Sequence, residues 1–344
     1  IDEQATPLGE NEYLIDRVKE PVALDQFKSL SAEQQAAFEH LVRGSDLGCV
    51  VGYAGTGKSY LLGEARRCWE ASGYRVVGMA LSGIAAENLE AGSGISSSTV
   101  ASWLWHWDRD RERLGASDIV VVDEAGMLGS RQLARVIEEA QRARSKVVLV
   151  GDPEQLQAIE AGAAFRAIAE RVGYVELVEV RRQREAWQQQ ATRDFASCRT
   201  YEGLLAYDRH NNVHVFETSD VAMKRMVEQW DEVRSQWPEK SQLMLAYTRA
   251  QVGQLNEQAR AIRQAGGELG DDRIVETARG ERAFAEGDRI YFLRNERSLG
   301  VKNGTLGTIE TISDHGDRFK VVLDRVDGQS VRLVEFSLKD YNDL

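Results

Sequence analysis

The octapeptide Gly52-Tyr53-Ala54-Gly55-Thr56-Gly57-Lys58-Ser59 decides the fold of this chain. It matches the phosphate-loop pattern G-x-x-x-x-G-K-[ST] at every fixed position, between an apolar run at 47–51 and a helical pattern at 60–69. The glycines let successive backbone N–H groups curl around phosphate oxygens, and the following helix N-terminus adds partial positive charge. Lys58 reaches the β- and γ-phosphates, and Ser59 offers its hydroxyl to Mg²⁺. The stretch therefore predicts a site for ATP and Mg²⁺, with contacts from Gly52, Gly55, Thr56, Gly57, Lys58 and Ser59.

Outward from this loop, short apolar strands alternate with helices. The predicted strands are 47–51, 75–81, 118–122 and 146–150, and the predicted helices between them are 60–69, 84–89 and 131–142. A capping box formed by Ser31 and Gln34 begins another helix ahead of the first strand. This alternation is typical of an α/β fold with a parallel sheet, in which ligands bind at the carboxyl ends of the strands.

The second half of the chain shows two further patterns. A weaker α/β pattern covers 174–263, with strands predicted at 174–178 and 242–247 and long helices at 185–198 and 220–237. From about Glu281, short alternating strands are separated by Asn303-Gly304 and Asp327-Gly328, which predict hairpins in a small β-barrel-like module. Four parts are predicted: a lead segment 1–29 with one short helix near 11–19, an ATP-binding domain 30–175, a partial second α/β domain 176–265 and a β module 266–344.

Polar side chains follow several of the predicted strands. Because parallel strands end at one edge of a sheet, Asp123 is predicted to hold Mg²⁺ and Glu124 to polarise the attacking water. Gln155 both donates and accepts hydrogen bonds, which suits γ-phosphate sensing, although an ordinary polar loop explains it equally well. Arg181 and Arg182 offer guanidinium groups to phosphate, but a solvated pair on a surface turn fits the sequence better.

The composition bounds the class of protein. Of 344 residues, 28% are charged and 42% are hydrophobic, and no apolar run approaches the ~18 residues of a membrane span. The net charge of −12 argues against wholesale coating of nucleic acid but leaves room for a local basic groove. Three cysteines outside any CxxC arrangement predict free thiols in a reducing cytoplasm. The chain begins with Ile1 and shows no signal peptide, so a piece of a longer cytoplasmic protein is expected.

Together these motifs resemble those of superfamily 1 helicases of the RecD-like class, which move 5′ to 3′ on single-stranded DNA. The phosphate loop and Asp123-Glu124 correspond to motifs I and II, and 30–34, 151–156 and 177–183 correspond to the Q-motif and motifs III and IV. The resemblance implies that Gln34 contacts adenine and that Gln155 and Arg182 act at the γ-phosphate. It also implies a P-loop NTPase fold with a RecA-like first domain and a partial RecA-like second domain.

The resemblance supplies contacts to single-stranded DNA as well. Ser82 lies in the segment that corresponds to motif Ia, and Thr99 lies in the threonine segment after it. Thr248 and Arg249 lie in a segment that resembles part of the second motor domain. These residues would position the strand through its phosphates without reading its sequence. Taken singly, each of them fits a helix cap or a surface position equally well.

The closest resemblance is to the helicase part of TraA-type conjugative relaxases. It rests on 51–55, 287–289 and 295–307, and the region around Asn303-Gly304 also resembles the SH3-like insertion of the class. The implied function is an ATP-dependent single-stranded DNA translocase or helicase. The implied partners are single-stranded DNA and other conjugative transfer proteins.

Two departures from the family leave other functions open. Motifs V and VI, the latter a source of a further arginine, do not occur before Leu344, so weak or no ATP turnover is expected of this chain. Trp103, Trp105 and Trp107 suit base stacking, but a core or interface role is favoured, and little room remains for a wedge hairpin before Asp118. The alternatives are a replication or repair helicase of the same class, and a non-catalytic scaffold module that binds ATP and DNA.

Overall fold

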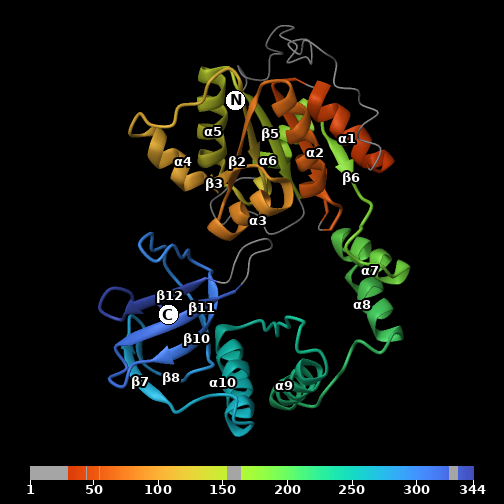
Figure 1. Ribbon diagram of the computed structural model, residues 1–344. Helices are drawn as coiled ribbons and strands as arrows, with labels where there is room; N and C mark the ends of the chain where they lie inside the picture. Colours follow the sequence, from red (N-terminus) through yellow and green to blue (C-terminus); the bar gives the residue numbers. More distant parts are fainter. Residues whose placement is uncertain (1–29, 44, 54, 153–163, 325–331) are drawn as a thin grey trace. The chain divides into compact units, whose positions relative to one another are not determined.

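The computed structural model describes residues 30–43, 45–53, 55–152, 164–324 and 332–344. The chain divides after His210 into two compact units. The first unit contains a six-stranded sheet with the order β3-β2-β4-β5-β1-β6, in which every neighbouring pair is parallel (Figure 1). Its strands are β1 (Leu47–Gly52), β2 (Arg75–Ala80), β3 (Ser97–Thr99), β4 (Asp118–Val122), β5 (Lys146–Gly151) and β6 (Val175–Leu177). The predicted α/β fold with a parallel sheet is therefore confirmed.

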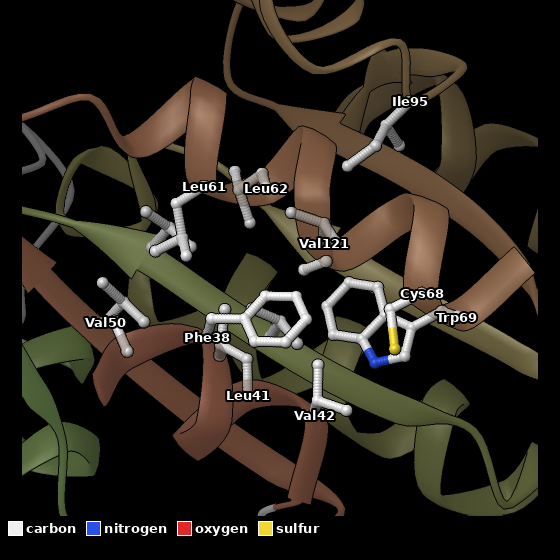
Figure 2. Packing of buried hydrophobic residues seen from close by; sticks show 14 of the residues in the cluster. Phe38, Leu41, Val42, Val50, Leu61, Leu62, Cys68, Trp69, Ile95 and Val121 are labelled. Carbon is white, nitrogen blue, oxygen red and sulfur yellow. The ribbon is translucent and has the colours of Figure 1, made fainter. Parts of the chain in front are cut away.

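Helices bury both faces of this sheet. Alternate residues of the central strands enter two separate cores: Val121 packs with α1, α2 and α3, whereas Val120 and Val122 pack with α4, α5 and α6. Figure 2 shows Phe38, Leu41 and Trp69 in the first of these cores. The helices are α1 (Ala32–Arg43), α2 (Lys58–Ala71), α3 (Gly83–Ser93), α4 (Val100–Trp107), α5 (Ser130–Ala143) and α6 (Ala164–Val172). Burial on both sides explains why the central strands β4 and β5 carry no polar side chain after their first residue.

The end of the first unit corrects one prediction. The strand predicted at 174–178 was assigned to a second α/β region, but β6 pairs with β1 in the first sheet, where Leu177 is buried. The predicted boundary between residues 175 and 176 therefore falls inside β6. A local pattern indicates that a segment is a strand, but it does not indicate which sheet the strand joins. Two helices complete the unit, α7 (Ala186–Ala196) and α8 (Thr200–Arg209).

The second unit combines two helices with antiparallel strands. A four-stranded sheet has the order β12-β11-β10-β9, and β7 and β8 form a separate hairpin. Its elements are α9 (Ser219–Gln236), α10 (Arg249–Ala265), β7 (Arg273–Thr277), β8 (Gly280–Phe284), β9 (Arg289–Tyr291), β10 (Leu306–Ile312), β11 (Arg318–Leu323) and β12 (Leu333–Ser337). The small antiparallel module is confirmed, although its strands begin before Glu281. Its SH3-like topology and the partial second RecA-like domain stay predictions.

The strand predicted at 242–247 is wrong. The segment has no strand partner in the part of the chain that the structure describes, and Leu243, Leu245 and Tyr247 are largely exposed. Met244 and Ala246 pack against the cluster between α9 and α10. Successive side chains therefore alternate between a packed side and an exposed side, as in a strand. A strand also needs a neighbour to pair its N–H and C=O groups, and the sequence of the segment does not provide one.

Other predictions lie outside the described residues. These are the lead segment 1–29 with its helix near 11–19, and the hairpin at Asp327-Gly328. Among the helices that the structure describes, none combines the length and the apolar character needed to cross a membrane.

Candidate nucleotide-binding site

The phosphate loop joins the end of β1 to the start of α2. Gly55 and Gly57 both have φ of 83°, in the left-handed region that favours glycine. Gly57 is the N-cap of α2 and provides no side-chain cap, so the first-turn N–H groups of this 14-residue helix stay available to an anion. A Cβ atom at Gly57 would lie 2.6 Å from Nε2 of Gln34. The loop conformation thus depends on glycine at both positions.

Two side chains brace the loop from inside. The ammonium group of Lys58 donates to the carbonyl oxygens of Gly52, at 2.8 Å, and Tyr53, at 3.2 Å. The hydroxyl of the buried Thr56 donates to the same Tyr53 carbonyl at 2.9 Å. A cation is therefore held within the curve of the loop, where phosphate oxygens would replace the carbonyl groups as its partners.

The predicted acidic pair follows β4 directly. Glu124 has φ of 50°, and its backbone N–H donates to Oδ1 of Asp123 at 3.0 Å. Burial raises the pKa of Asp123, while the Glu124 N–H bond and Lys58 act in the opposite direction. Burial also raises the pKa of Glu124, against the effect of Lys58. The carboxylates of Asp123 and Glu124 are thus partly shielded from solvent, and the positive charge of Lys58 partly compensates for this burial.

A third loop, residues 178–182, lies against the phosphate loop and is called the arginine loop below. The backbone N–H groups of Arg181 and Arg182 donate to the carbonyl oxygen of Gly55 at 2.8 and 3.1 Å. A Cβ atom at Gly55 would lie 2.7 Å from Cβ of Arg182. The guanidinium group of Arg181 pairs with Glu179 at 2.7 Å. Glycine at position 55 therefore lets the arginine loop reach the nucleotide site.

These elements enclose one pocket of about 640 Å³, within the range of small-molecule sites. Its lining residues are Gly55, Thr56, Gly57, Lys58, Ser59, Tyr60, Asp123, Glu124, Arg181 and Arg182. The structure thus brings together most of the predicted nucleotide, metal and catalytic residues, and Gly52 lies just behind them at the end of β1. Tyr60, which no motif predicted, and Arg181, which the sequence favoured as a solvated surface residue, also line the pocket. Their positions beside Ser59 and Arg182 were the only sequence signals for these roles.

Gln34, a predicted nucleotide-binding residue, lies outside the pocket lining and supports the phosphate loop from behind. Gln34 is buried, and its amide donates to the carbonyl of Thr56 at 3.3 Å and accepts from the N–H of Ser31 at 3.2 Å. The capping box is confirmed, because the hydroxyl of Ser31 also accepts from the N–H of Gln34. Gln34 therefore supports the phosphate loop, and its contact to adenine stays a prediction. Gln155 lies outside the described residues.

Three of the four predicted DNA contacts are helix N-caps. The hydroxyls of Ser82, Thr99 and Thr248 accept backbone N–H bonds at the starts of α3, α4 and α10. Ser82 lies just after β2, and Thr99 is the last residue of the neighbouring strand β3, where it pairs with Ala80. Thr248 and the exposed Arg249 belong to the second unit.

The tryptophan cluster divides between core and surface. Trp103 and Trp107 are buried, as favoured from the sequence, whereas Trp105 is 44% exposed. The guanidinium group of Arg109 lies 4.1 Å from the centre of the Trp105 ring.

The sequence model of the AAA domain family matches residues 29–218, more than half of the chain. The chain belongs to the AAA domain family. It is 42% identical to the conjugal transfer protein TraA of Rhizobium radiobacter, over 99% of this chain and 30% of that protein. The ATP-dependent RecD2 DNA helicase of Deinococcus radiodurans is 31% identical over 45% of this chain and 22% of its own length.

A solved structure shares the fold of this family member. Bacteroides Pif1 bound to single-stranded DNA has a TM-score of 0.51 and 19% identity, covering 90% of this chain and 74% of that chain. The resemblance to RecD-like helicases, and to TraA-type proteins in particular, is confirmed. The chain spans less than a third of the length of the curated relatives it matches.

Proposed function

We propose that this chain is the motor region of a longer DNA-processing protein, an ATP-dependent translocase or helicase that moves 5′ to 3′ on single-stranded DNA within a conjugative relaxase. The observation that carries the proposal is the gathering of Lys58, Ser59, Asp123, Glu124 and Arg182 around one pocket. The names of the TraA and RecD2 relatives support the choice of conjugation and DNA. Conjugative transfer proteins as partners, and a cytoplasmic location, belong to the same proposal.

Each side chain has a role in this proposal. Lys58 and the N-terminus of α2 would bind the β- and γ-phosphates, and Arg182 would bind the γ-phosphate from the arginine loop. Glu124 would accept a proton from the attacking water, because a carboxylate whose pKa is raised is a stronger base. Gln155 would orient that water.

The residues present fit Mg²⁺. This ion prefers hard oxygen ligands, and the pocket offers the hydroxyl of Ser59 and the carboxylate of Asp123. Burial raises the pKa of Asp123, so the ionised carboxylate gains from a neighbouring cation. Asp123 and Ser59 would hold the ion, which would neutralise charge on the phosphates.

Single-stranded DNA would bind at the sheet edge where β2 and β3 end. There Ser82 and Thr99 begin two helices, and helix N-termini attract phosphate. In the second unit, Thr248 and Arg249 at the start of α10 would offer phosphate contacts of their own.

Nucleotide binding tests the first half of the proposal. A fluorescent ADP derivative with Mg²⁺ should bind the wild-type chain, and Lys58→Ala should abolish binding by removing the cation beside the phosphates. Arg142→Ala is the matched control, because this exposed arginine lies in the last turn of α5. Unchanged affinity in Lys58→Ala would refute the assignment of the site.

DNA binding tests the second half. Fluorescence anisotropy with poly-dT, mixed-sequence single strands and duplex should show preference for single strands, indifference to sequence and weakening with salt. Equal or tighter binding of duplex DNA would contradict the translocase hypothesis and favour a scaffold module. In a longer chain that hydrolyses ATP, Glu124→Gln should keep nucleotide binding and lose turnover.

A further inference from the structure

Glu33 connects the first helix to the arginine loop. It lies in the first turn of α1, and its Oε2 accepts the backbone N–H groups of Val178, at 3.1 Å, and Glu179, at 3.0 Å. The partners are 145 and 146 residues away in sequence. Bonds to an ionised acceptor are stronger than those between neutral groups, so a single oxygen anchors the start of the arginine loop.

The end of the same loop is anchored to the phosphate loop. The N–H groups of Arg181 and Arg182 donate to the carbonyl of Gly55, and Val180 between the two anchors is 1% exposed. Glu33 and its neighbour Gln34 thus act on different loops. Glu33 holds the arginine loop, and Gln34 donates to the carbonyl of Thr56 in the phosphate loop.

We propose that Glu33 is a positioning residue that fixes Arg182 in the place where it recognises the γ-phosphate. The inference rests on the proposed role of Arg182 and adds a residue that the motifs did not single out. The direct phosphate-loop contacts, from Lys58 and the N-terminus of α2, do not pass through residues 178–182. Loss of the Glu33 anchor should therefore weaken the binding of a nucleoside triphosphate and spare that of a diphosphate.

The experiment compares the affinities of the 344-residue chain for ADP and for a non-hydrolysable ATP analogue, both with Mg²⁺. Glu33→Ala should weaken the binding of the analogue about tenfold and leave ADP binding within about twofold. A tenfold change in affinity corresponds to about 1.4 kcal/mol. Glu39→Ala is the control, because Glu39 lies in the same helix and carries the same charge. It should leave both affinities unchanged.

Two conservative variants separate positioning from charge and from folding. Glu33→Gln keeps a carbonyl oxygen at the same reach and should retain most of the preference for the analogue. Glu33→Asp keeps the negative charge, which favours a helix N-terminus, but withdraws the oxygen, so it should lose the preference as Glu33→Ala does. This variant also tests the proposal if Glu33→Ala does not fold.

The outcomes distinguish this inference from the proposed function. If Arg182→Ala lowers the preference for the analogue while Glu33→Ala and Glu33→Asp do not, the positioning role is overturned and the proposed function stands. If Arg182→Ala itself has no effect, the γ-phosphate role of that arginine fails. When both roles hold, Glu33→Ala should add nothing to the loss of preference in an Arg182→Ala background.

Discussion

Replacing Gly55 by alanine tests whether the nucleotide site depends on the close approach of the arginine loop. Gly55 has φ of 83°, and an added Cβ would lie 2.7 Å from Cβ of Arg182. The atom it meets is attached to the backbone and cannot rotate away as the end of a long side chain could. The backbone of Arg182 is itself bonded to the carbonyl of Gly55, so the contact cannot be relieved without breaking that bond.

The size of the effect follows from two contributions. A left-handed conformation costs alanine about 1–2 kcal/mol. Forcing a methyl group into an occupied space costs about 1–3 kcal/mol more. The variant can relax by shifting the phosphate loop itself, whose N–H groups and Lys58 would bind the phosphates, and ADP binding would then have to restore that loop. We therefore expect ADP affinity to fall at least about tenfold, which corresponds to about 1.4 kcal/mol.

Gly73 provides a matched control. It has φ of 85° and lies between α2 and β2, and nothing lies within 4 Å of the Cβ that alanine would add. Gly73→Ala should lower the free energy of unfolding in urea by about 1–2 kcal/mol and leave ADP affinity unchanged. Titration of a fluorescent ADP derivative and urea unfolding measure both quantities for each variant. An affinity of Gly55→Ala equal to that of Gly73→Ala would refute the reasoning about the arginine loop.

Three further predictions concern charged groups. Burial lowers the pKa of Lys146 from 10.5 to about 8, so at this group the unfolded chain binds more protons between these values, and the contribution of Lys146 to stability should rise with pH there by about 3 kcal/mol. Urea unfolding of Lys146→Met should lack this rise. Burial raises the pKa of Asp123, so stability without metal should fall as pH rises through that pKa, and thermal unfolding in a chelator should show Asp123→Asn to be more stable than wild type at pH 7. Arg249→Ala should lower the salt dependence of single-strand binding by about one unit, equally for all sequences, as anisotropy at several salt concentrations would show.

The parallel sheet and the phosphate loop of the first unit were predictable because their signals are local. The strand predicted at 118–122 has the same bounds as β4, since a run of apolar residues with no polar side indicates burial on both faces. The position of Asp123 and Glu124 followed from the rule that parallel strands end at one edge. The phosphate loop required no tertiary information, because its glycines and the start of α2 specify its shape.

What could not be predicted depends on distant partners. The alternation in 242–247 was correct, with Met244 and Ala246 packed inward, but pairing depends on a second strand. Likewise, β6 was found as a strand and assigned to the wrong sheet. The anchor from Glu33 to residues 178 and 179 joins segments that are 145 residues apart, and no spacing rule connects them.

The caps at Ser82 and Thr99 reconcile the two interpretations that the sequence left open. A hydroxyl group has one donor hydrogen and two acceptor lone pairs. Capping uses an acceptor, with the N–H of Ala85 at 3.2 Å from Oγ of Ser82 and the N–H of Ser102 at 3.1 Å from Oγ1 of Thr99. The O–H of each residue can then donate to a phosphate oxygen, which has no hydrogen of its own to offer. A cap at the end of a parallel strand also begins a helix, whose N-terminus attracts the same phosphate. Capping and DNA contact are therefore compatible roles of one hydroxyl group. The cap fixes the position of the oxygen and leaves the hydroxyl hydrogen available to a DNA phosphate.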